Sequence, residues 1–317
     1  MVDQKYAGLL MIGDPHLEGR QPGFRKDNYP EVILGKLAWC LDYAHQHSLL
    51  PVILGDLFDK PRDNPNWMLV RLLDLFNREI IGLYGNHDCA DPTLCHHDSL
   101  SLLVTSGRLR LLTEDSPWQG IVGGRMVIVG GSSYRQKIPH QFVAQGECGP
   151  SPPLVIWLTH HDLVVPGYDE GRFKPRELPG IDLVINGHIH RRLEDVITGG
   201  TRWLTPGNIS RRKRSDVTRD HVPSVLRLNV SCDGYEASYV PVPHRPFEEV
   251  FHEAVAEMAA EPTASAFVAG LAELQARRTA TGAGLMEFLE RRLDQFEPEV
   301  SRQIMLLAEE VTGNGSK

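Results

Sequence analysis

Residues 7–16 of this 317-residue chain read AGLLMIGDPH, an apolar run that ends in a glycine followed by Asp14 and His16. The run is almost continuously apolar, which is typical of a strand covered on both faces. Similar runs recur at 50–54, 79–84, 125–129, 154–158 and 182–185. Segments with helical spacing lie between them, notably 29–47 and 67–78. This alternation predicts a layered α/β fold.

Five of these runs lead directly into aspartate, asparagine or histidine. The motifs are Gly13-Asp14-Pro15-His16, Gly55-Asp56-Leu57-Phe58-Asp59, Gly85-Asn86-His87-Asp88, Thr159-His160-His161-Asp162 and Asn186-Gly187-His188-Ile189-His190. Ligand sites in open α/β sheets lie beyond the carboxyl ends of the strands. A single Gly-Asp or Gly-His pair after a strand is ordinary turn chemistry. It is the recurrence at five strand ends that predicts one shared site.

The residue types in these motifs suit divalent cations. Carboxylates combined with neutral imidazoles favour Mn²⁺, Fe or Zn²⁺, whereas Mg²⁺ and Ca²⁺ sites are mostly oxygen. One carboxylate can bridge two cations, and Asp56 is the natural bridge. Two cations about 3.5–4 Å apart can activate a water and neutralise a phosphoryl group during in-line displacement. A nearby imidazole that is not a ligand, for which His87 is the candidate, would stabilise the phosphate or protonate the leaving oxygen.

In this order the motifs resemble those of the calcineurin-like binuclear metallophosphoesterase superfamily, D-x-H, G-D-x-x-D, G-N-H-D/E, H and G-H-x-H. The resemblance spans residues 14–190, and Thr205-Pro206-Gly207-Asn208 is similar to the family's P-G-S/N segment. It implies a four-layer α-β-β-α sandwich and two divalent cations, with Mn²⁺ expected and Fe, Zn²⁺ or Mg²⁺ as alternatives. By family role the metal ligands are Asp14, His16, Asp56 and His190 for one cation, and Asp56, Asn86, His160 and His188 for the other.

Two further roles come from the motif positions. His87 would be the catalytic histidine that does not bind metal. His160 and His161 both follow the fourth strand, and either is a candidate ligand. The first histidine after a strand usually takes the ligand role in this family, which favours His160 and leaves His161 as a group on the substrate side.

Within the superfamily, the chain looks most like the Mre11/SbcD-type DNA nucleases and their phage relatives. The segments that carry this likeness are GDPHL at 13–17, RKDN at 25–28, GDLFD at 55–59 and SLSLL at 99–103. Mre11 proteins often have histidine where this chain has Asp59, which leaves endonuclease or exonuclease action open. The implied function is metal-dependent hydrolysis of DNA phosphodiester bonds, in single strands or at ends. The alternative is a phosphatase or phosphodiesterase for a nucleotide or another small phosphoester. An SMC-like ATPase partner follows by analogy only.

Basic residues follow several of the motifs. Arg191 comes directly after the last histidine, and Arg211 and Arg212 follow the Pro-Gly-Asn segment. We expect them to bind phosphates that flank the cleaved one, although most arginine runs are solvated loops. The net charge of −8 is unlike that of most nucleic-acid binders, but two bound divalent cations would offset about half of it.

Composition argues against a secreted or membrane protein. The five cysteines are odd in number and scattered, which argues against a disulfide framework. No apolar run approaches the roughly 20 residues that span a bilayer, and the first residues do not resemble a signal peptide. The expectation is therefore a cytoplasmic location without a membrane partner.

The pattern changes towards the end of the chain. Residues 225–230 and 236–242 alternate like two strands joined by a turn at 232–234. Beyond Pro243, helical spacing recurs at 247–260, 264–276, 285–296 and 299–311. These features predict a metallophosphoesterase domain at 1–246 and a small helical appendage at 247–317.

Overall fold

The computed structural model describes residues 6–144, 152–169 and 171–252. All of them belong to one compact unit, Met1–His252. The predicted helices at 264–276, 285–296 and 299–311 lie outside the described residues. The boundary predicted at 246/247 therefore stays a prediction.

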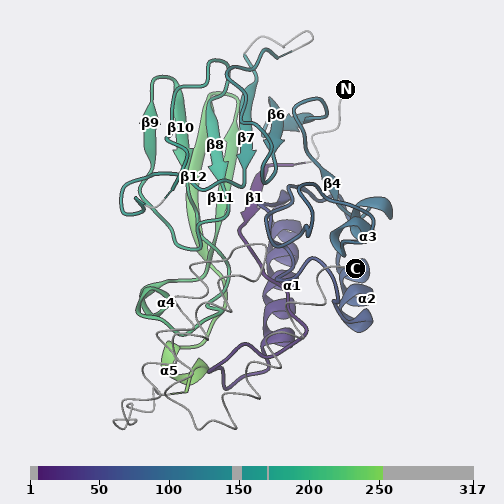
Figure 1. Cartoon of the computed structure of the whole chain (residues 1–317). Helices are drawn as coiled ribbons and strands as arrows, with labels where there is room; N and C mark the ends of the chain where they lie inside the picture. Colours follow the sequence, from purple (N-terminus) through teal and green to yellow (C-terminus); the bar gives the residue numbers. More distant parts are fainter. Residues whose placement is uncertain (1–5, 145–151, 170, 253–317) are drawn as a thin grey trace, which may run out of the picture. The chain divides into compact units, whose positions relative to one another are not determined.

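The first of two six-stranded sheets has the order β12-β11-β1-β2-β3-β4 (Figure 1). Strands β1 to β4 run parallel to one another, and β11 and β12 form an antiparallel hairpin that pairs with β1. The strands are β1 (Gly8–Ile12), β2 (Leu49–Ile53), β3 (Ile81–Gly82), β4 (Arg110–Leu111), β11 (Ser224–Ser231) and β12 (Gly234–Pro241). The strands and the turn predicted between 225 and 242 are confirmed.

The second sheet has the order β5-β6-β7-β8-β10-β9. Its four inner strands are parallel, and the two edge strands are antiparallel to their neighbours. The strands are β5 (Trp118–Val122), β6 (Arg125–Ser132), β7 (Leu154–Thr159), β8 (Leu183–Asn186), β9 (Val196–Thr198) and β10 (Thr201–Leu204). The sequence analysis predicted β6, β7 and β8 but not the other three.

Alternate residues of each central strand face different layers. In β1, Leu9 and Met11 pack between the two sheets, whereas Leu10 and Ile12 pack on the opposite face. Because both faces are covered, all five residues of this strand are buried. The continuous apolar run in the sequence is the consequence of that double coverage.

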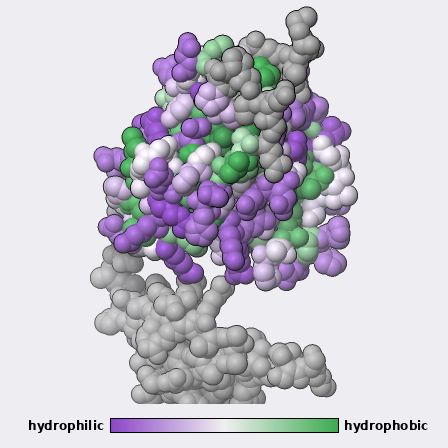
Figure 2. All heavy atoms as spheres, turned by 90° about the horizontal axis from the view of Figure 1, so that it is seen from above, coloured by the Kyte–Doolittle hydropathy of each residue, from purple (hydrophilic) through white to green (hydrophobic). Residues whose placement is uncertain are grey.

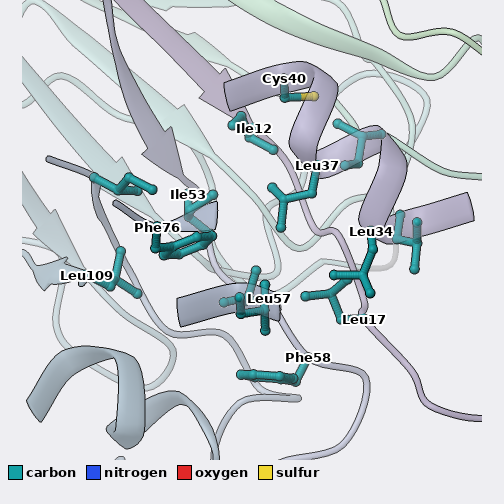
Figure 3. Packing of buried hydrophobic residues seen from close by; sticks show 14 of the residues in the cluster. Ile12, Leu17, Leu34, Leu37, Cys40, Ile53, Leu57, Phe58, Phe76 and Leu109 are labelled. Carbon is teal, nitrogen blue, oxygen red and sulfur yellow. The ribbon is translucent and has the colours of Figure 1, made fainter. Parts of the chain in front are cut away.

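Helices cover the outer face of the first sheet. They are α1 (Tyr29–Gln46), α2 (Asn66–Leu75) and α3 (Leu100–Thr105). In α1, Ile33, Leu37, Cys40 and Ala44 recur at helical spacing and are fully buried. Figure 3 shows this helix packed with Leu17, Leu57 and Phe58 of the loops that leave the strands. The core therefore fixes the loops in which the polar motifs lie.

The outer face of the second sheet is covered differently. Trp157, Val184 and Trp203 pack there against loop residues, including Leu163, Leu178 and Ile189. Among the described residues, no helix contributes to this cluster. The layered α/β sandwich is confirmed, with loops forming this outer layer in the described part of the chain.

The face seen in Figure 2 is mainly hydrophilic, with hydrophobic residues in small separated patches. No helix in the described ranges is long and apolar enough to cross a membrane.

Two short helices lie late in the described chain, α4 (Asp216–Asp220) and α5 (Phe247–Val250). The helix predicted at 247–260 is wrong at 251, where Phe251 is extended with φ −115° and ψ 143°. This conformation lets Phe251 bury its ring beside Phe247 and pair its backbone with Arg25. Tertiary packing thus overrides the helical spacing of the sequence.

Candidate metal centre

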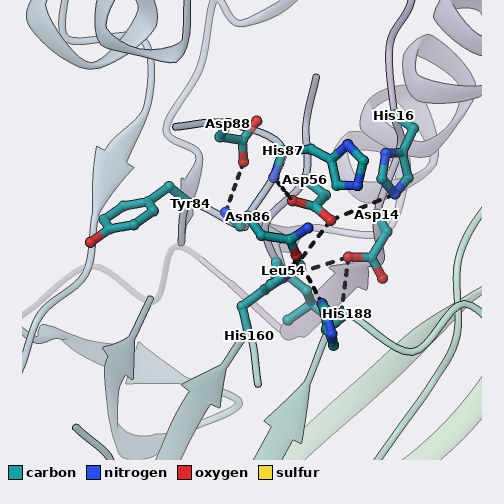
Figure 4. Close-up of polar contacts among 12 residues, drawn as sticks. Asp14, His16, Leu54, Asp56, Tyr84, Asn86, His87, Asp88, His160 and His188 are labelled. Atoms are coloured by element: carbon teal, nitrogen blue, oxygen red, sulfur yellow. Dashed lines mark hydrogen bonds and ion pairs between the residues drawn. The ribbon is translucent and has the colours of Figure 1, made fainter. Parts of the chain in front are cut away.

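The five polar motifs converge at the carboxyl ends of parallel strands. Three follow the neighbouring strands β1, β2 and β3 of one sheet, and two follow the neighbours β7 and β8 of the other. Figure 4 shows Asp14, Asp56, Asn86, His160 and His188 pointing toward one another from these loops. The strand ends of both sheets therefore build a single cluster.

The loops adopt an uncommon backbone conformation at four of the predicted ligands. The φ angles are +35° at Asp14, +48° at His16, +46° at Asp56 and +70° at His188. Positive φ is costly for residues with a side chain, and such residues concentrate at functional sites. Hydrogen bonds between loops hold this geometry: His16 N donates to the carbonyl of Asp56 over 2.9 Å, and His188 N donates to Asp14 Oδ1 over 3.1 Å.

Motif glycines leave the space that the cluster needs. A Cβ on Gly85 would lie 2.0 Å from Asp56 Oδ1 and 2.6 Å from the backbone nitrogen of Asp56. A Cβ on Gly55, whose φ is +102°, would lie 2.3 Å from His160 Nδ1. These two glycines are therefore required by close packing around the cluster.

Gly85→Ala is expected to lower metal affinity and phosphoester hydrolysis by about 100-fold, the upper range for losing a group that supports metal ligands. The added methyl group must displace the Asp56 loop, because that contact involves backbone. Gly35→Ala is the matched control, since Gly35 lies in α1 and a Cβ there meets nothing within 4 Å. Metal titration and hydrolysis would be measured on both variants. Normal metal binding by Gly85→Ala would contradict the prediction.

Three groups of side chains in the described residues could hold a cation: one combines His16, Asp59 and His87, and the other two share Asp56. Of the two that share Asp56, one consists of His16, Asp56 and His190, and the other of Asp56, His160 and His188; within each group the candidate ligand atoms lie within 4.8 Å of one another. Asp56 Oδ2 lies 3.6 Å from His16 Nε2 and 3.2 Å from His160 Nε2. The position of Asp56 between the groups is what the bridging role requires.

Asn86 and Asp14 complete the surroundings of the cluster. Asn86 Oδ1 lies 2.9 Å from His188 Nδ1 and 3.3 Å from His160 Nε2. Asp14 Oδ1 lies 3.6 Å from His160 Nδ1. The structure thus brings together all seven predicted ligands, while their roles as ligands stay a prediction.

The two adjacent histidines of the fourth motif point to different places. His160 lies in the cluster, and its Nδ1 donates to the carbonyl of Leu54 over 2.8 Å, which leaves Nε2 for a metal. His161 instead donates from Nε2 to the carbonyl of Gln136, 2.8 Å away. This arrangement favours His160 as the ligand.

The donor set fits divalent cations on chemical grounds. His16 Nε2 and His190 Nε2 face each other at 2.9 Å, and two imidazole lone pairs require a proton or a cation between them. Asp14 Oδ2 and Asp59 Oδ1 are buried without a hydrogen-bond partner among the described residues. The other oxygen of each carboxylate has a partner, but a buried carboxylate oxygen left without one is costly unless a cation compensates it.

The pKa values of the cluster are strongly shifted. Burial raises the pKa of Asp14 to about 7, although His160 opposes the shift. Burial also opposes ionisation of Asp56, but His160, His16 and His87 together hold the pKa of Asp56 below its usual range. Burial opposes protonation of His160, yet Asp56 and Asp14 raise its pKa to about 9, so this imidazole must lose a proton to bind a metal. Burial lowers the pKa of His188 to about 4, which keeps its imidazole neutral and its lone pair free for a metal.

His87 stands beside the cluster, with 39% of its side chain exposed. Its Nδ1 donates to the carbonyl of Asp59 over 2.8 Å, so Nε2 is the free nitrogen. Its backbone nitrogen donates to Asp56 Oδ1 over 2.8 Å. His87 is thus held by the Asp56 loop at the edge of a hollow, as a residue that acts on substrate would be.

The three arginines predicted to bind substrate do not all lie at the same site. Arg191 and Arg212 line a hollow of about 690 Å³ together with His16, His87 and His190; we call it the histidine hollow. Within it, Arg212 forms ion pairs with Asp59 at 2.7 Å and Glu18 at 2.9 Å.

Arg211 is not brought to the histidine hollow. It is 9% exposed and donates to the carbonyls of His221 and Arg245. Although Arg211 follows the Pro-Gly-Asn segment closely in sequence, its side chain does not lie at the candidate metal centre.

Two residues that support the site had no assigned role in the sequence analysis. Asp88 is fully buried and accepts backbone hydrogen bonds from Gly85, Leu57 and Phe58, which ties two motif loops together. Asn186, the last residue of β8, accepts from Thr159 Oγ1 at 2.7 Å and from the backbone nitrogen of His161, just after β7, at 3.0 Å. The role of Asn186 could have been predicted from the sequence, because an asparagine at the end of a buried apolar strand is unusual.

Comparison with known proteins agrees with this geometry. The family model described as calcineurin-like phosphoesterase matches residues 9–192. The chain belongs to this family. Membership implies metal-dependent hydrolysis of phosphoesters at a binuclear site for divalent cations, and it confirms the superfamily predicted from the motifs. No curated protein sequence matches the chain significantly.

Two solved structures are similar to this chain at low sequence identity. The sulfate thiohydrolase SoxB of Thermus thermophilus, in complex with glycerol, is 14% identical with a TM-score of 0.37. The match covers 88% of this chain, which spans 60% of the length of SoxB. Vps29 of Chaetomium thermophilum is 13% identical with a TM-score of 0.31, and the match covers 76% of this chain and 97% of Vps29.

Proposed function

We propose that this phosphoesterase is a nuclease that hydrolyses DNA phosphodiester bonds, with Mn²⁺ as the activating cation. In favour of a polyanionic substrate, Arg191, Arg212 and Lys213 line the same histidine hollow as the candidate metal ligands. Cationic side chains around a phosphoryl site bind the phosphates that flank the cleaved one. The proposal agrees with the resemblance of the motifs to the Mre11/SbcD-type branch.

The chain's own residues have distinct tasks in this reaction. Asp14, His16, Asp56, Asn86, His160, His188 and His190 would hold the cations. When bound, the cations would activate water and neutralise charge on the phosphoryl group. In its protonated form, His87 would stabilise the developing charge or give its Nε2 proton to the leaving oxygen, because its Nδ1–H is donated to the Asp59 carbonyl.

The direct test is to strip the protein of metal and resupply Mn²⁺, Mg²⁺, Zn²⁺ or Ca²⁺. Single-stranded DNA, duplex DNA and bis-p-nitrophenyl phosphate would be offered side by side. We expect stripping to abolish hydrolysis and Mn²⁺ to restore DNA cleavage. Asp56→Asn and His87→Ala control for a contaminating nuclease, because both should lack the restored activity.

A small phosphoester is the second candidate substrate. The volume of the histidine hollow, about 690 Å³, is that of a small-molecule pocket. Arg212 is already paired with Asp59 and Glu18, which reduces its availability for a second phosphate. Cleavage of bis-p-nitrophenyl phosphate with all DNA left intact would support this candidate and refute the nuclease proposal.

A further inference from the structure

A second hollow, of about 600 Å³, opens beside the metal cluster. His188 lines both this hollow and the histidine hollow, so the two meet at a candidate metal ligand. Its other walls come from the loop that follows β6 and from residues 172–176. A substrate longer than one phosphoester can therefore extend from the cluster into this second hollow.

Positive charge dominates this second hollow. Five exposed cationic side chains line it, and we call it the cationic hollow: Arg135, Lys137, Arg172, Lys174 and Arg176. Within the described part of the chain, Asp162 is the one carboxylate in its lining. Among the described residues, only Arg172 of the five forms an ion pair, with Asp162 at 3.8 Å. Arg135 lies over the Tyr134 ring and Arg176 donates to the carbonyl of Ile138 over 3.5 Å, but neither contact neutralises the charge that a polyanion would meet.

Two aromatic rings accompany these cations. Phe173 is 48% exposed, and its ring meets His161 edge-on with the centroids 5.3 Å apart. Tyr134 stacks on His188 with the centroids 6.4 Å apart and the planes 25° from parallel. A large exposed aromatic ring beside cations is the combination that binds unpaired bases by stacking and phosphates by charge.

The ring of Phe173 is held in place by its backbone. Phe173 N donates to the carbonyl of Asp162 over 3.0 Å, and its carbonyl accepts from Val164 N over 2.8 Å. Both partners lie, like His160, in the segment that follows β7. The backbone that carries the Phe173 ring is therefore tied to the segment that carries His160.

We infer that the cationic hollow binds the part of a single-stranded polynucleotide that flanks the scissile phosphate, with Phe173 stacking on a base and Arg135 and Lys174 contacting phosphates. This inference rests on the proposed nuclease function and adds to it the strand type and the side on which the strand leaves the cluster. Bases of a duplex are already stacked on one another, so the ring favours a single strand.

The test compares the hydrolysis of two substrates by the same variant. Phe173→Ala is expected to raise KM about ten-fold for an oligothymidylate of about 12 nucleotides. Hydrolysis of bis-p-nitrophenyl phosphate, which carries no flanking nucleotides, should fall far less. Phe173→Trp should restore the oligonucleotide KM, because tryptophan also stacks on bases. Trp67→Ala is the control, since Trp67 is an aromatic residue of α2 with 41% exposure.

A second measurement addresses the charges. Neutralising both Arg135 and Lys174 to glutamine should reduce the slope of log affinity against log salt by about 1.4, or roughly 0.7 per phosphate contact. Binding would be measured by anisotropy on a His87→Ala background, which slows cleavage. The matched control is the double variant Arg110→Gln and Arg125→Gln, which removes two cations on β4 and β6 outside the hollow and should keep the salt slope.

The outcomes separate the two levels of inference. If wild-type protein cleaves no DNA, both the nuclease proposal and the inference about the cationic hollow are refuted. If wild-type protein cleaves single-stranded DNA but Phe173→Ala and the double glutamine variant keep its KM and salt slope, only the cationic hollow is refuted. Equal effects on the oligonucleotide and on the small ester would indicate damage to the metal cluster and would also refute it.

Discussion

Asp56→Asn is expected to abolish phosphoester hydrolysis and to leave the protein with at most one tightly bound cation. Asp56 belongs to two of the three candidate metal groups, those that contain the predicted ligands His190 and His188, so its loss removes a ligand from each. Substituting a residue that only supports metal ligands costs about 10–100-fold in affinity or activity, and losing a shared ligand should exceed the upper value. Asparagine keeps the volume and can still accept the hydrogen bond from His87 N, which limits the change to charge and metal binding.

Metal content per chain and hydrolysis of bis-p-nitrophenyl phosphate would be measured together. Asp74→Asn is the matched control, because Asp74 is an exposed aspartate on α2 and should keep full activity. Thermal unfolding with and without added Mn²⁺ adds a readout that does not depend on catalysis. Cation binding stabilises the native state by mass action, so Asp56→Asn should lose most of that stabilisation. Two cations bound normally by Asp56→Asn would refute the shared position of Asp56.

The position of the site could be predicted from sequence because its chemistry is local to each strand. Every candidate ligand follows an apolar run by a few residues, and parallel strands end at the same edge of a sheet. The need for the motif glycines became visible only in the structure, where a side chain at Gly55 or Gly85 would collide with His160 or Asp56. The order of apolar strands and polar motifs was therefore sufficient to predict the fold class and the type of site.

Side-chain direction could not be predicted, because it depends on contacts between distant segments. Arg211 and Arg212 are neighbours in sequence, yet one binds the carbonyls of His221 and Arg245 and the other pairs with Glu18. The cationic hollow was missed for the same reason, since the loop after β6 and residues 172–176 show no common motif. The helix predicted at 247–260 ended early because burial of aromatic rings outweighed helical spacing.

His87→Ala is expected to lower kcat by about 10²–10⁴-fold while metal content stays unchanged, the usual contribution of a positioned acid or base. The hydrogen bond from Nδ1 to the Asp59 carbonyl leaves Nε2 for a phosphoryl or leaving oxygen. A role as proton donor has a further signature. The loss should be largest for esters with an alkyl leaving group, which needs a proton, and smallest for p-nitrophenolate, which leaves readily without one.

A series of phosphodiesters with leaving groups of increasing basicity would measure this dependence for wild-type protein and for His87→Ala. His47→Ala, an exposed histidine at the end of α1, is the matched control. A steeper dependence on leaving-group basicity in His87→Ala indicates proton donation, whereas an equal loss across the series indicates stabilisation of the phosphoryl charge. His87 also belongs to a cluster with His16 and Asp59 that could hold an ion. Loss of a cation from His87→Ala would therefore reassign His87 as a ligand, and the acid-base step would have to come from another group.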